Sequence, residues 1–349
     1  MKTLKSLLLI SFFFLNIQFS VGQNVVELPH KPIDKSYFEL KKTLEKIDES
    51  NDQKSIDISI KALGKYKDPE IRYHFIYWEL SFHYAKLKQY DKCLEILLKG
   101  QKEGLFYFIR SSDNTFPEYV TELNKLDGFD EFMKNNTLLK DEASKTTNTE
   151  FMIKLPENYN KNNKYPLMLI LHGGIGNIPD LQMDYISDKL KNGFILAYFQ
   201  GASLAGSYTR GFTNGWFGRV KKGYDQIIAK YAVDTTKVII AGPSAGGARS
   251  IILGVNNMIP AKGLLLSFAV TPGGIDSTTY INSAKRGLKI ALLCGEKDWA
   301  IKEQKELGVN FDKYGFTNRF VVFPEKGHEY PDNWSYHLDT SLEFLLKEE

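Results

Sequence analysis

Residues 238–254, VIIAGPSAGGARSIILG, decide the fold of this chain, because they predict a buried strand, a tight turn at Ser244 and a helix. The apolar run before Gly242 is typical of a strand covered on both faces. Gly242 and Gly246 flank the serine where side chains would collide with neighbouring backbone, so the stretch predicts a nucleophile elbow. The amide of Ala245, at the start of the helix, is a predicted donor to an oxyanion.

A second serine stands in a similar pattern. Ser203 lies in residues 201–205, GASLA, but the second glycine is missing and a long Gly-rich stretch follows in place of a helix. We therefore expect Ser203 to be an ordinary loop residue.

The first 22 residues are typical of a secretory signal peptide. Lys2 and Lys5 precede the apolar run 7–15, and small residues end at Gly22, where we expect cleavage. The alternative, an uncleaved membrane anchor, requires about 18 to 20 apolar residues, and polar residues interrupt the run before that length. We therefore expect the mature protein to be secreted or periplasmic.

Composition limits the classes of partner. Removal of two lysines with the signal peptide lowers the formal charge from +3 to +1, so neither nucleic acid nor an anionic membrane is an expected partner. Cys93 and Cys294 are the only cysteines, which is too few for a disulfide framework, and each is predicted to be a small buried residue. Chain length and pattern predict a helical domain over 23–135, a polar linker over 136–150 and a second domain over 151–349.

The apolar pattern over 36–135 is helical throughout. Residues 70–104 resemble one tetratricopeptide repeat, with departures at Ser81 and Leu105; the matching positions are Tyr77, Leu80, Tyr84, Cys93, Leu97 and Gly100. A single repeat cannot bury its own apolar face. We therefore expect this domain to dock on the second one, with residues 106–116 near the cleft, or else to bind a protein partner.

From residue 151 onward, short apolar runs alternate with helical patterns. This rhythm predicts a doubly wound, mostly parallel α/β sheet. The expected strands are 151–155, 166–171, 194–199, 238–241, 263–268, 289–294 and 319–323, with helices over 180–191 and 335–347 and another from about Val220. In such sheets the site lies beyond the carboxyl ends of the strands.

Three strand ends carry further chemistry. The amide of Gly174, in the His-Gly-Gly run after the strand 166–171, is a second predicted oxyanion donor, whereas His172 is expected to hold that loop. Asp298 follows the strand 289–294 and is the predicted orienting acid, with Glu296 as the alternative. His328 follows the last strand and is the predicted general base.

These landmarks together resemble the α/β-hydrolase superfamily, and within it the carboxylesterase, phospholipase and dienelactone-hydrolase-like branch. The similar stretches are YPLMLILHGG, VDTTKVIIAGPSAGG, CGEKD and FPEKGHEYP, while Pro243 departs from that branch, which often carries a bulkier residue there. The resemblance implies hydrolysis of an ester or thioester through an acyl-serine, with Ser244, Asp298 and His328 as the triad. No metal and no cofactor are expected.

Residues 201–219 form a Gly-rich, aromatic stretch after a strand, which predicts a loop at the rim of the site. Tyr208, Arg210 and Trp216 are the predicted substrate-binding residues, because aromatic rings suit an aromatic acyl group or a sugar and arginine suits a carboxylate. The alternative is a loop whose aromatic rings pack beneath it. The expected substrate is a small-molecule or saccharide-linked ester.

Two other functions remain open at this point. One is a serine peptidase on the same fold. The other is an interaction protein, in which the helical domain binds a partner and the hydrolase domain is an inactive platform. The complete set of Ser244, Asp298 and His328 favours an enzyme.

Overall fold

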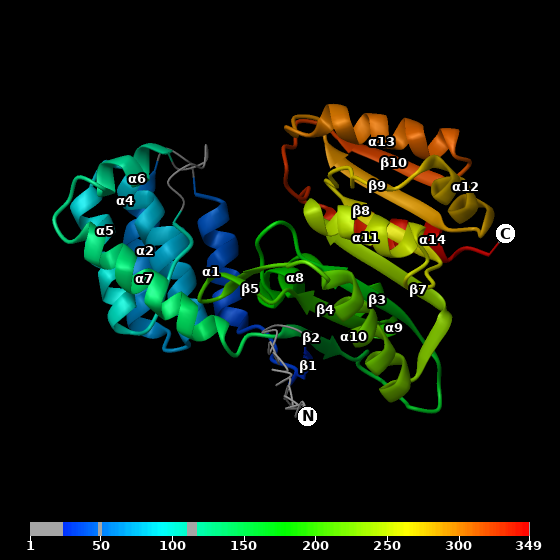
Figure 1. The fold of residues 1–349 in the computed structure, drawn as a ribbon, viewed down its shortest axis with the longest axis horizontal. Coiled ribbons are helices and arrows are strands. Elements are labelled where there is room, and N and C mark those ends of the chain that lie inside the picture. Colours follow the sequence, from blue (N-terminus) through cyan, green and yellow to red (C-terminus); the bar gives the residue numbers. More distant parts are fainter. Residues whose placement is uncertain (1–23, 48–50, 110–116, 349) are drawn as a thin grey trace, which may run out of the picture.

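The computed structural model describes residues 24–47, 51–109 and 117–348, which form a helical region and a sheet region side by side (Figure 1). The predicted signal peptide lies outside these residues. Within the described ranges, no helix has both the length and the apolar content needed to cross a bilayer.

The predicted doubly wound, mostly parallel sheet is confirmed. Every neighbouring pair of strands runs parallel except β2 and β4. Among the described residues the sheet has eight strands, in the order β1 (Val25–Leu28), β2 (Thr149–Lys154), β4 (Ile195–Gln200), β3 (Tyr165–Leu171), β7 (Val233–Pro243), β8 (Gly263–Ser267), β9 (Lys289–Gly295) and β10 (Asn318–Phe323).

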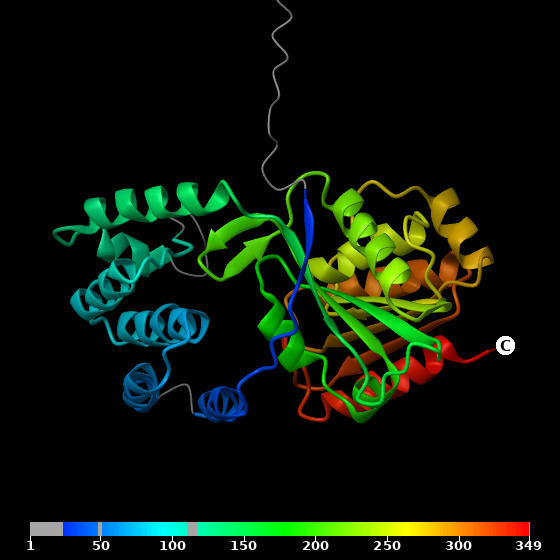
Figure 2. The same ribbon diagram turned by 90° about the horizontal axis from the view of Figure 1, so that it is seen from below.

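Helices cover both faces of the sheet, as Figure 2 shows for α10 and α12 on one side and α14 on the other. Alternate residues of β3 explain the two layers, because Leu167 and Leu169 enter one apolar cluster and Met168 and Ile170 the other. The first cluster includes side chains of α10 (Trp216–Lys230), α11 (Ala245–Val255), α12 (Ser277–Lys285) and α13 (Ile301–Lys313). The second includes side chains of α8 (Ile178–Asp184), α9 (Asp188–Gly193) and α14 (Trp334–Leu346).

The helical region has its own apolar core, in which Leu80, Cys93 and Leu97 are fully buried. Its elements are α1 (Lys35–Glu45), α2 (Asp52–Lys65), α3 (Pro69–Tyr73), the π-helical segment η1 (His74–Ser81), α4 (Phe82–Lys86), α5 (Tyr90–Lys102), α6 (Pro117–Leu123) and α7 (Phe129–Ser144). The helical pair expected over 70–104 is therefore present, although its first member is partly π-helical. Its resemblance to a tetratricopeptide repeat stays a prediction.

Two predicted boundaries are wrong. Residues 136–144, expected in the linker, continue α7, because the Asn136 side chain is buried and bonds both the N–H and the C=O of Tyr107 at 2.7 and 2.8 Å. At the other end, residues 25–28 form β1 and pair with β2, so they belong to the sheet and not to the helical domain. The four-residue strand is too short for its sequence pattern to identify it.

Two further expectations differ from the structure. The helix expected over 180–191 is divided into α8 and α9, because Ser187 caps a new helix by accepting from the amide of Leu190 at 3.2 Å. The loop expected over 201–219 contains a two-stranded hairpin of β5 (Ser203–Gly206) and β6 (Thr209–Gly211). Ser203 therefore begins a strand.

The hairpin joins the two regions. At its tip, the amide of Ser207 donates to the carbonyl of Phe106 at 2.9 Å, and the Phe106 amide donates to the Ser207 hydroxyl at 2.8 Å. Lys41 of α1 pairs with Asp180 of α8 at 2.9 Å. The two regions are therefore in contact through these hydrogen bonds and this ion pair, and Met183 and Tyr208 of the sheet region also pack on the apolar core of the helical region. Part of the predicted border, residues 110–116, lies outside the described residues.

Candidate active site

Ser244 occupies the strained turn between β7 and α11, with φ 53° and ψ −124°. A non-glycine residue rarely adopts this backbone conformation, and it persists only where the surroundings impose it. The Ser244 amide donates to the carbonyl of Ser267 at 2.8 Å, and its carbonyl accepts from Ala248 at 3.2 Å. These bonds to β8 and α11 hold the turn in place.

The two glycines of the elbow are required by close backbone approach. A Cβ at Gly242 would lie 2.4 Å from the carbonyl oxygen of Leu171, and one at Gly246 would lie 2.1 Å from the same atom. Both distances are far below van der Waals contact. The steric reason for glycine that the sequence suggests therefore holds in the structure.

Asp298 and His328 meet beyond the ends of β9 and β10. Nδ1 of His328 lies 2.9 Å from Oδ2 of Asp298, whose side chain is fully buried. A carboxylate at this position accepts, so Nδ1 carries the hydrogen and Nε2 is left as the basic nitrogen. Glu296, the alternative acid, accepts instead from the amide of Glu325 at 3.1 Å.

Two other donors fix the Asp298 carboxylate. Oδ1 accepts from the amide of Ala300 at 2.8 Å, and Oδ2 accepts from the side-chain amide of Gln304 at 3.0 Å. Gln304 is fully buried on the inner face of α13. Sequence reasoning missed it, although a glutamine at an apolar position of a helix is itself a signal of a buried polar contact.

Aromatic rings surround the imidazole of His328. Phe268, directly after β8 and with φ 50°, has its ring centroid 5.4 Å from that of the imidazole. Trp299 stacks on it at 5.3 Å and is itself 71% exposed, so it forms an open aromatic wall beside the imidazole. No hydrogen bond joins the Ser244 hydroxyl to His328 among the described residues; the two share the same edge of the sheet.

The predicted oxyanion donors belong to two segments near Ser244, the start of α11 and the loop after β3. Within the described part of the chain, neither the Gly174 amide nor the Ala245 amide has an acceptor. A Cβ placed on Gly173 would lie 3.7 Å from Cβ of Ser244, so this loop passes close to the serine. Both amides are thus available to an oxygen that develops negative charge.

Arg249 holds the loop that carries Gly174, and sequence reasoning missed it. Its Nη1 donates to the carbonyls of His172 and Gly173 at 3.0 and 2.9 Å. In a trans peptide the carbonyl and the following N–H point in opposite directions, so a carbonyl of Gly173 turned toward Arg249 directs the Gly174 N–H away from it. The guanidinium of Arg249 also lies 4.6 Å from the ring centroid of Phe212.

The His172 ring makes no hydrogen bond to Ser244, Asp298 or His328 among the described residues. Its Nε2 accepts from the amide of Gly201 at 3.2 Å, and Nδ1 lies 3.0 Å from the carbonyl of Gly173. Burial, reinforced by the charge of Arg249, lowers the pKa of His172 to about 3, so the ring stays neutral. The neutral ring can donate at one nitrogen and accept at the other, which suits a residue that fixes a loop.

The three residues predicted to bind substrate do not form one group. Arg210 pairs with Glu150 at 3.1 Å and bonds the carbonyl of Asn148, so its charge is already balanced. Trp216 packs against Phe212 at the start of α10. Tyr208 lies at the tip of the hairpin, beside the helical region.

Metal ligands and cysteine thiols were also considered as site residues in the described ranges. No group of three or more His, Cys, Asp or Glu side chains there is placed to hold a metal ion. Cys93 and Cys294 are buried free thiols, and burial raises the pKa of each to about 12.

The strand order, the elbow at the end of β7 and the acid and histidine beyond β9 and β10 define an α/β-hydrolase fold, preceded here by a smaller helical region. The fold alone does not identify the reaction, because one fold can carry many functions.

Comparison with known proteins gives distant similarities to solved structures. No family model and no curated protein matches the chain. An uncharacterized protein from Bacillus cereus ATCC 10987 is similar over 89% of this chain and 98% of its own, at 18% identity and a TM-score of 0.45. A ferulic acid esterase is similar over 56% and 90%, at 17% identity and a TM-score of 0.45. The Bacillus cereus carboxylesterase is similar over 56% and 93%, at 17% identity and a TM-score of 0.43.

Proposed function

We propose that this protein is an exported serine hydrolase that cleaves a carboxylic ester or thioester through an acyl-serine intermediate. The observation that carries the proposal is the bond between His328 and the buried Asp298, at the same sheet edge as the strained Ser244. The lysines and apolar run of residues 1–22 support export. We propose a small-molecule or saccharide-linked ester as the substrate class.

The reaction follows from the roles of the three side chains. Nε2 of His328 takes the proton of the Ser244 hydroxyl while Oγ of Ser244 bonds to the carbonyl carbon of the ester. The carbonyl oxygen becomes negative and accepts from the amides of Gly174 and Ala245. Asp298 stabilises the imidazolium that forms, and its other hydrogen bonds keep it oriented.

The tetrahedral intermediate then collapses. The bond from carbon to the leaving oxygen or sulfur breaks as His328 returns the proton to that atom, which leaves the acyl group on Ser244. A water molecule then reacts in the same way. His328 takes a proton from the water, the water oxygen attacks the acyl carbon, and His328 returns the proton to the Ser244 oxygen as the acyl group leaves. The products are a carboxylic acid and an alcohol or thiol.

Ester turnover by matched serine variants tests the proposal. We expect the purified chain to hydrolyse p-nitrophenyl acetate or butyrate, Ser244→Ala to lose at least about 10³-fold in kcat/KM, and Ser203→Ala to keep wild-type kinetics. The Asp298→Asn variant should lose activity through the wrong imidazole tautomer. Equal turnover by wild type and Ser244→Ala would refute the assignment, and cleavage of peptide amides without cleavage of esters would replace the esterase by a peptidase.

A further inference from the structure

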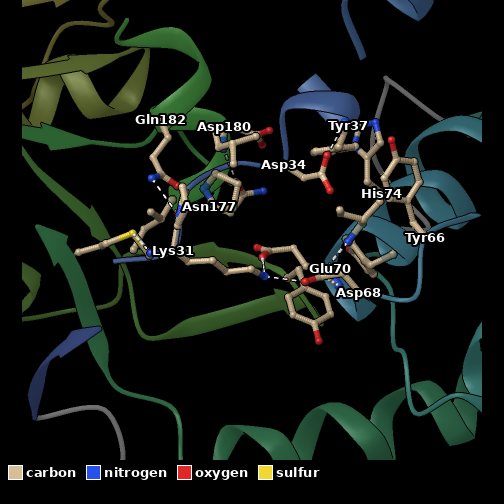
Figure 3. A pocket seen from close by; sticks show the side chains of 18 of the residues that line it. Lys31, Asp34, Tyr37, Tyr66, Asp68, Glu70, His74, Asn177, Asp180 and Gln182 are labelled. Atoms are coloured by element: carbon tan, nitrogen blue, oxygen red, sulfur yellow. Dashed lines mark hydrogen bonds and ion pairs between the residues drawn. The ribbon is translucent and has the colours of Figure 1, made fainter. Parts of the chain in front are cut away.

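A cavity of about 950 Å³ lies between the helical region and the sheet region (Figure 3). Its walls come from the segment before α1, from α1, α3, η1 and α8, and from Tyr208 of the hairpin. None of Ser244, Asp298 and His328 is among the described residues that line it. The cavity is therefore separate from the proposed catalytic group, and its size is within the usual range for a small-molecule site.

Aromatic side chains make up much of the wall. They are Tyr37, Tyr66, Tyr73, Trp78 and Tyr208, which come from both regions of the molecule. Trp78 remains 38% exposed, although it belongs to the helical region with its own core. Tyr208 contacts Tyr73 at 5.7 Å, so the hairpin completes this wall. Of these five, Trp78 and Tyr208 keep exposed surface, and flat rings of this kind suit a ligand with an apolar face.

Ion pairs already engage four charged side chains of the cavity wall, Lys31, Asp68, Glu70 and Asp180. Lys31 pairs with Asp68 at 2.7 Å and with Glu70 at 3.5 Å, as Figure 3 shows. Asp180 pairs with Lys41 at 2.9 Å. A charged ligand would have to compete with these pairs and bury its own charge, which is unfavourable. The cavity therefore favours an uncharged ligand.

Two buried polar side chains face the cavity with unused hydrogen-bonding groups. Gln182 is 6% exposed and donates from its amide nitrogen to the carbonyl of Lys31 at 3.2 Å, but its amide oxygen has no donor among the described residues. Tyr37 is 7% exposed, and its hydroxyl likewise has no partner in the described part of the chain. Neither oxygen is sealed from solvent, so both are open to a ligand in the cavity.

We propose that this cavity binds a neutral saccharide. A sugar ring combines an apolar C–H face, which can stack on Trp78 or Tyr208, with hydroxyl groups that can pair with Gln182 and Tyr37. An aliphatic ligand would cover these two polar groups without replacing the hydrogen bonds they make to water, at a cost in affinity. A saccharide satisfies both the aromatic and the polar parts of the wall.

The position of the cavity adds a link to the site at Ser244. Asn177 lines the cavity and lies three residues beyond the predicted oxyanion donor Gly174. Between them, Gly176 exchanges two backbone hydrogen bonds with Arg210, two residues after Tyr208. The saccharide site therefore borders the loop of the proposed oxyanion hole, although binding in the cavity does not depend on any reaction at Ser244.

Isothermal titration calorimetry on the full Ser244→Ala chain tests the proposal without interference from hydrolysis. The probes are maltotriose, xylotriose and cellotriose. We expect at least one to bind saturably with a millimolar or lower Kd. Trp78→Ala and Gln182→Leu, each made in that background, should weaken binding about tenfold or more, which corresponds to about 1.4 kcal/mol.

Matched controls keep the result interpretable. Ile60→Ala removes an apolar side chain of similar exposure from α2, outside the cavity, and should leave the Kd unchanged. Each variant is used only if its thermal unfolding matches that of the parent, and Gln182→Leu provides the answer if Trp78→Ala does not fold. The proposal would be overturned if no trisaccharide bound saturably, if neither cavity variant weakened binding relative to the Ser244→Ala parent, or if an acetylated, amidated tri-alanine bound in place of the sugars.

These outcomes are separate from those of the proposed function. Ester turnover is measured with p-nitrophenyl esters on the wild-type chain, whereas saccharide binding is measured on an inactive one. A protein that hydrolyses esters but binds no trisaccharide would overturn only the saccharide site.

Discussion

At the scale of single residues, the proposed site depends on side chains that orient other groups. Arg249 is the example with the most direct consequence, because it holds the carbonyls of His172 and Gly173 and thereby orients the Gly174 amide. Loss of one oxyanion donor lowers kcat by about 10²- to 10³-fold. We expect Arg249→Met to lower kcat by about 10- to 100-fold with little change in KM, as measured by steady-state ester hydrolysis.

Arg286 provides a matched control for this prediction. It also donates to two backbone carbonyls, those of Gly254 and Val255, but at the far end of α11. Arg286→Met should therefore leave kcat unchanged. Equal kcat values for wild type and Arg249→Met would show that the loop needs no such support.

Asp184 gives a prediction on stability and pH. Burial, with the nearby Asp180 carboxylate, raises the pKa of the Asp184 carboxyl from 3.8 to about 7. Between these values the unfolded chain releases a proton that the folded chain keeps, so the free energy of unfolding falls as pH rises from about 4 to 7 and then levels off. Asp184→Asn removes this penalty, so it should be more stable than wild type at pH 8 but not at pH 4.5. Since solvent screens part of the effect, the expected difference at pH 8 is about 1–2 kcal/mol.

Urea unfolding at pH 4.5, 6 and 8 measures this difference. Asp141→Asn, at an exposed position of α7, is the control and should show no such trend. A stability difference between wild type and Asp184→Asn that is the same at all three pH values would contradict the prediction.

The candidate site was partly predictable from the sequence. Ser244, Asp298 and His328 each follow a recognisable strand, so their positions at one edge of the sheet follow from the topology rule. Arg249 and Gln304 were not predictable, because their roles depend on which carbonyl or carboxylate the folded chain brings within reach. Sequence spacing carries no information on such contacts.

At the scale of elements, the elbow gives a prediction about close packing. A Cβ at Gly246 would lie 2.1 Å from a backbone oxygen that cannot move without displacing β3. We expect Gly246→Ala to lower the free energy of unfolding by about 3 kcal/mol or more and to abolish ester turnover. Chemical denaturation and kinetics measure both effects.

Gly218 is the matched control within α10. A Cβ placed there meets no atom within 4 Å, so Gly218→Ala should leave activity unchanged and be neutral or stabilising by up to about 1 kcal/mol. A well-folded, active Gly246→Ala variant would contradict the steric account of the elbow.

The same scale shows why parts of the fold were missed. Strands β3, β7, β8 and β9 were predictable because their apolar runs are buried on both faces. The hairpin of β5 and β6 was not, because its small and polar residues are held partly by contact with Phe106, about 100 positions away in the sequence. The end of α7 was missed because a helix with one buried face and many polar residues resembles a linker in sequence.

At the scale of the whole molecule, the helical region should remain attached after the chain is cut. Three features cross between the regions: the two hydrogen bonds between Phe106 and Ser207, the ion pair of Lys41 with Asp180, and the strand β1. We expect a protease site inserted after Lys145, beyond α7, to give two fragments that co-elute in gel filtration.

Cleavage in dilute buffer without denaturant is the informative condition. Two fragments that elute separately, each folded, and a sheet fragment with unchanged kinetics would show that the helical region is an independent module. Loss of ester turnover only after the fragments are forced apart in urea would support mutual stabilisation of the two regions.

The central claim is that Ser244 is the nucleophile, and covalent labelling tests it most directly. A fluorophosphonate reacts with an activated serine, and peptide mass spectrometry then locates the label. We expect one label per chain, on the peptide that contains Ser244, in wild type and Ser203→Ala but not in Ser244→Ala, and slow labelling in His328→Ala. A label on another residue, or ester turnover that continues with Ser244 unlabelled, would contradict the account.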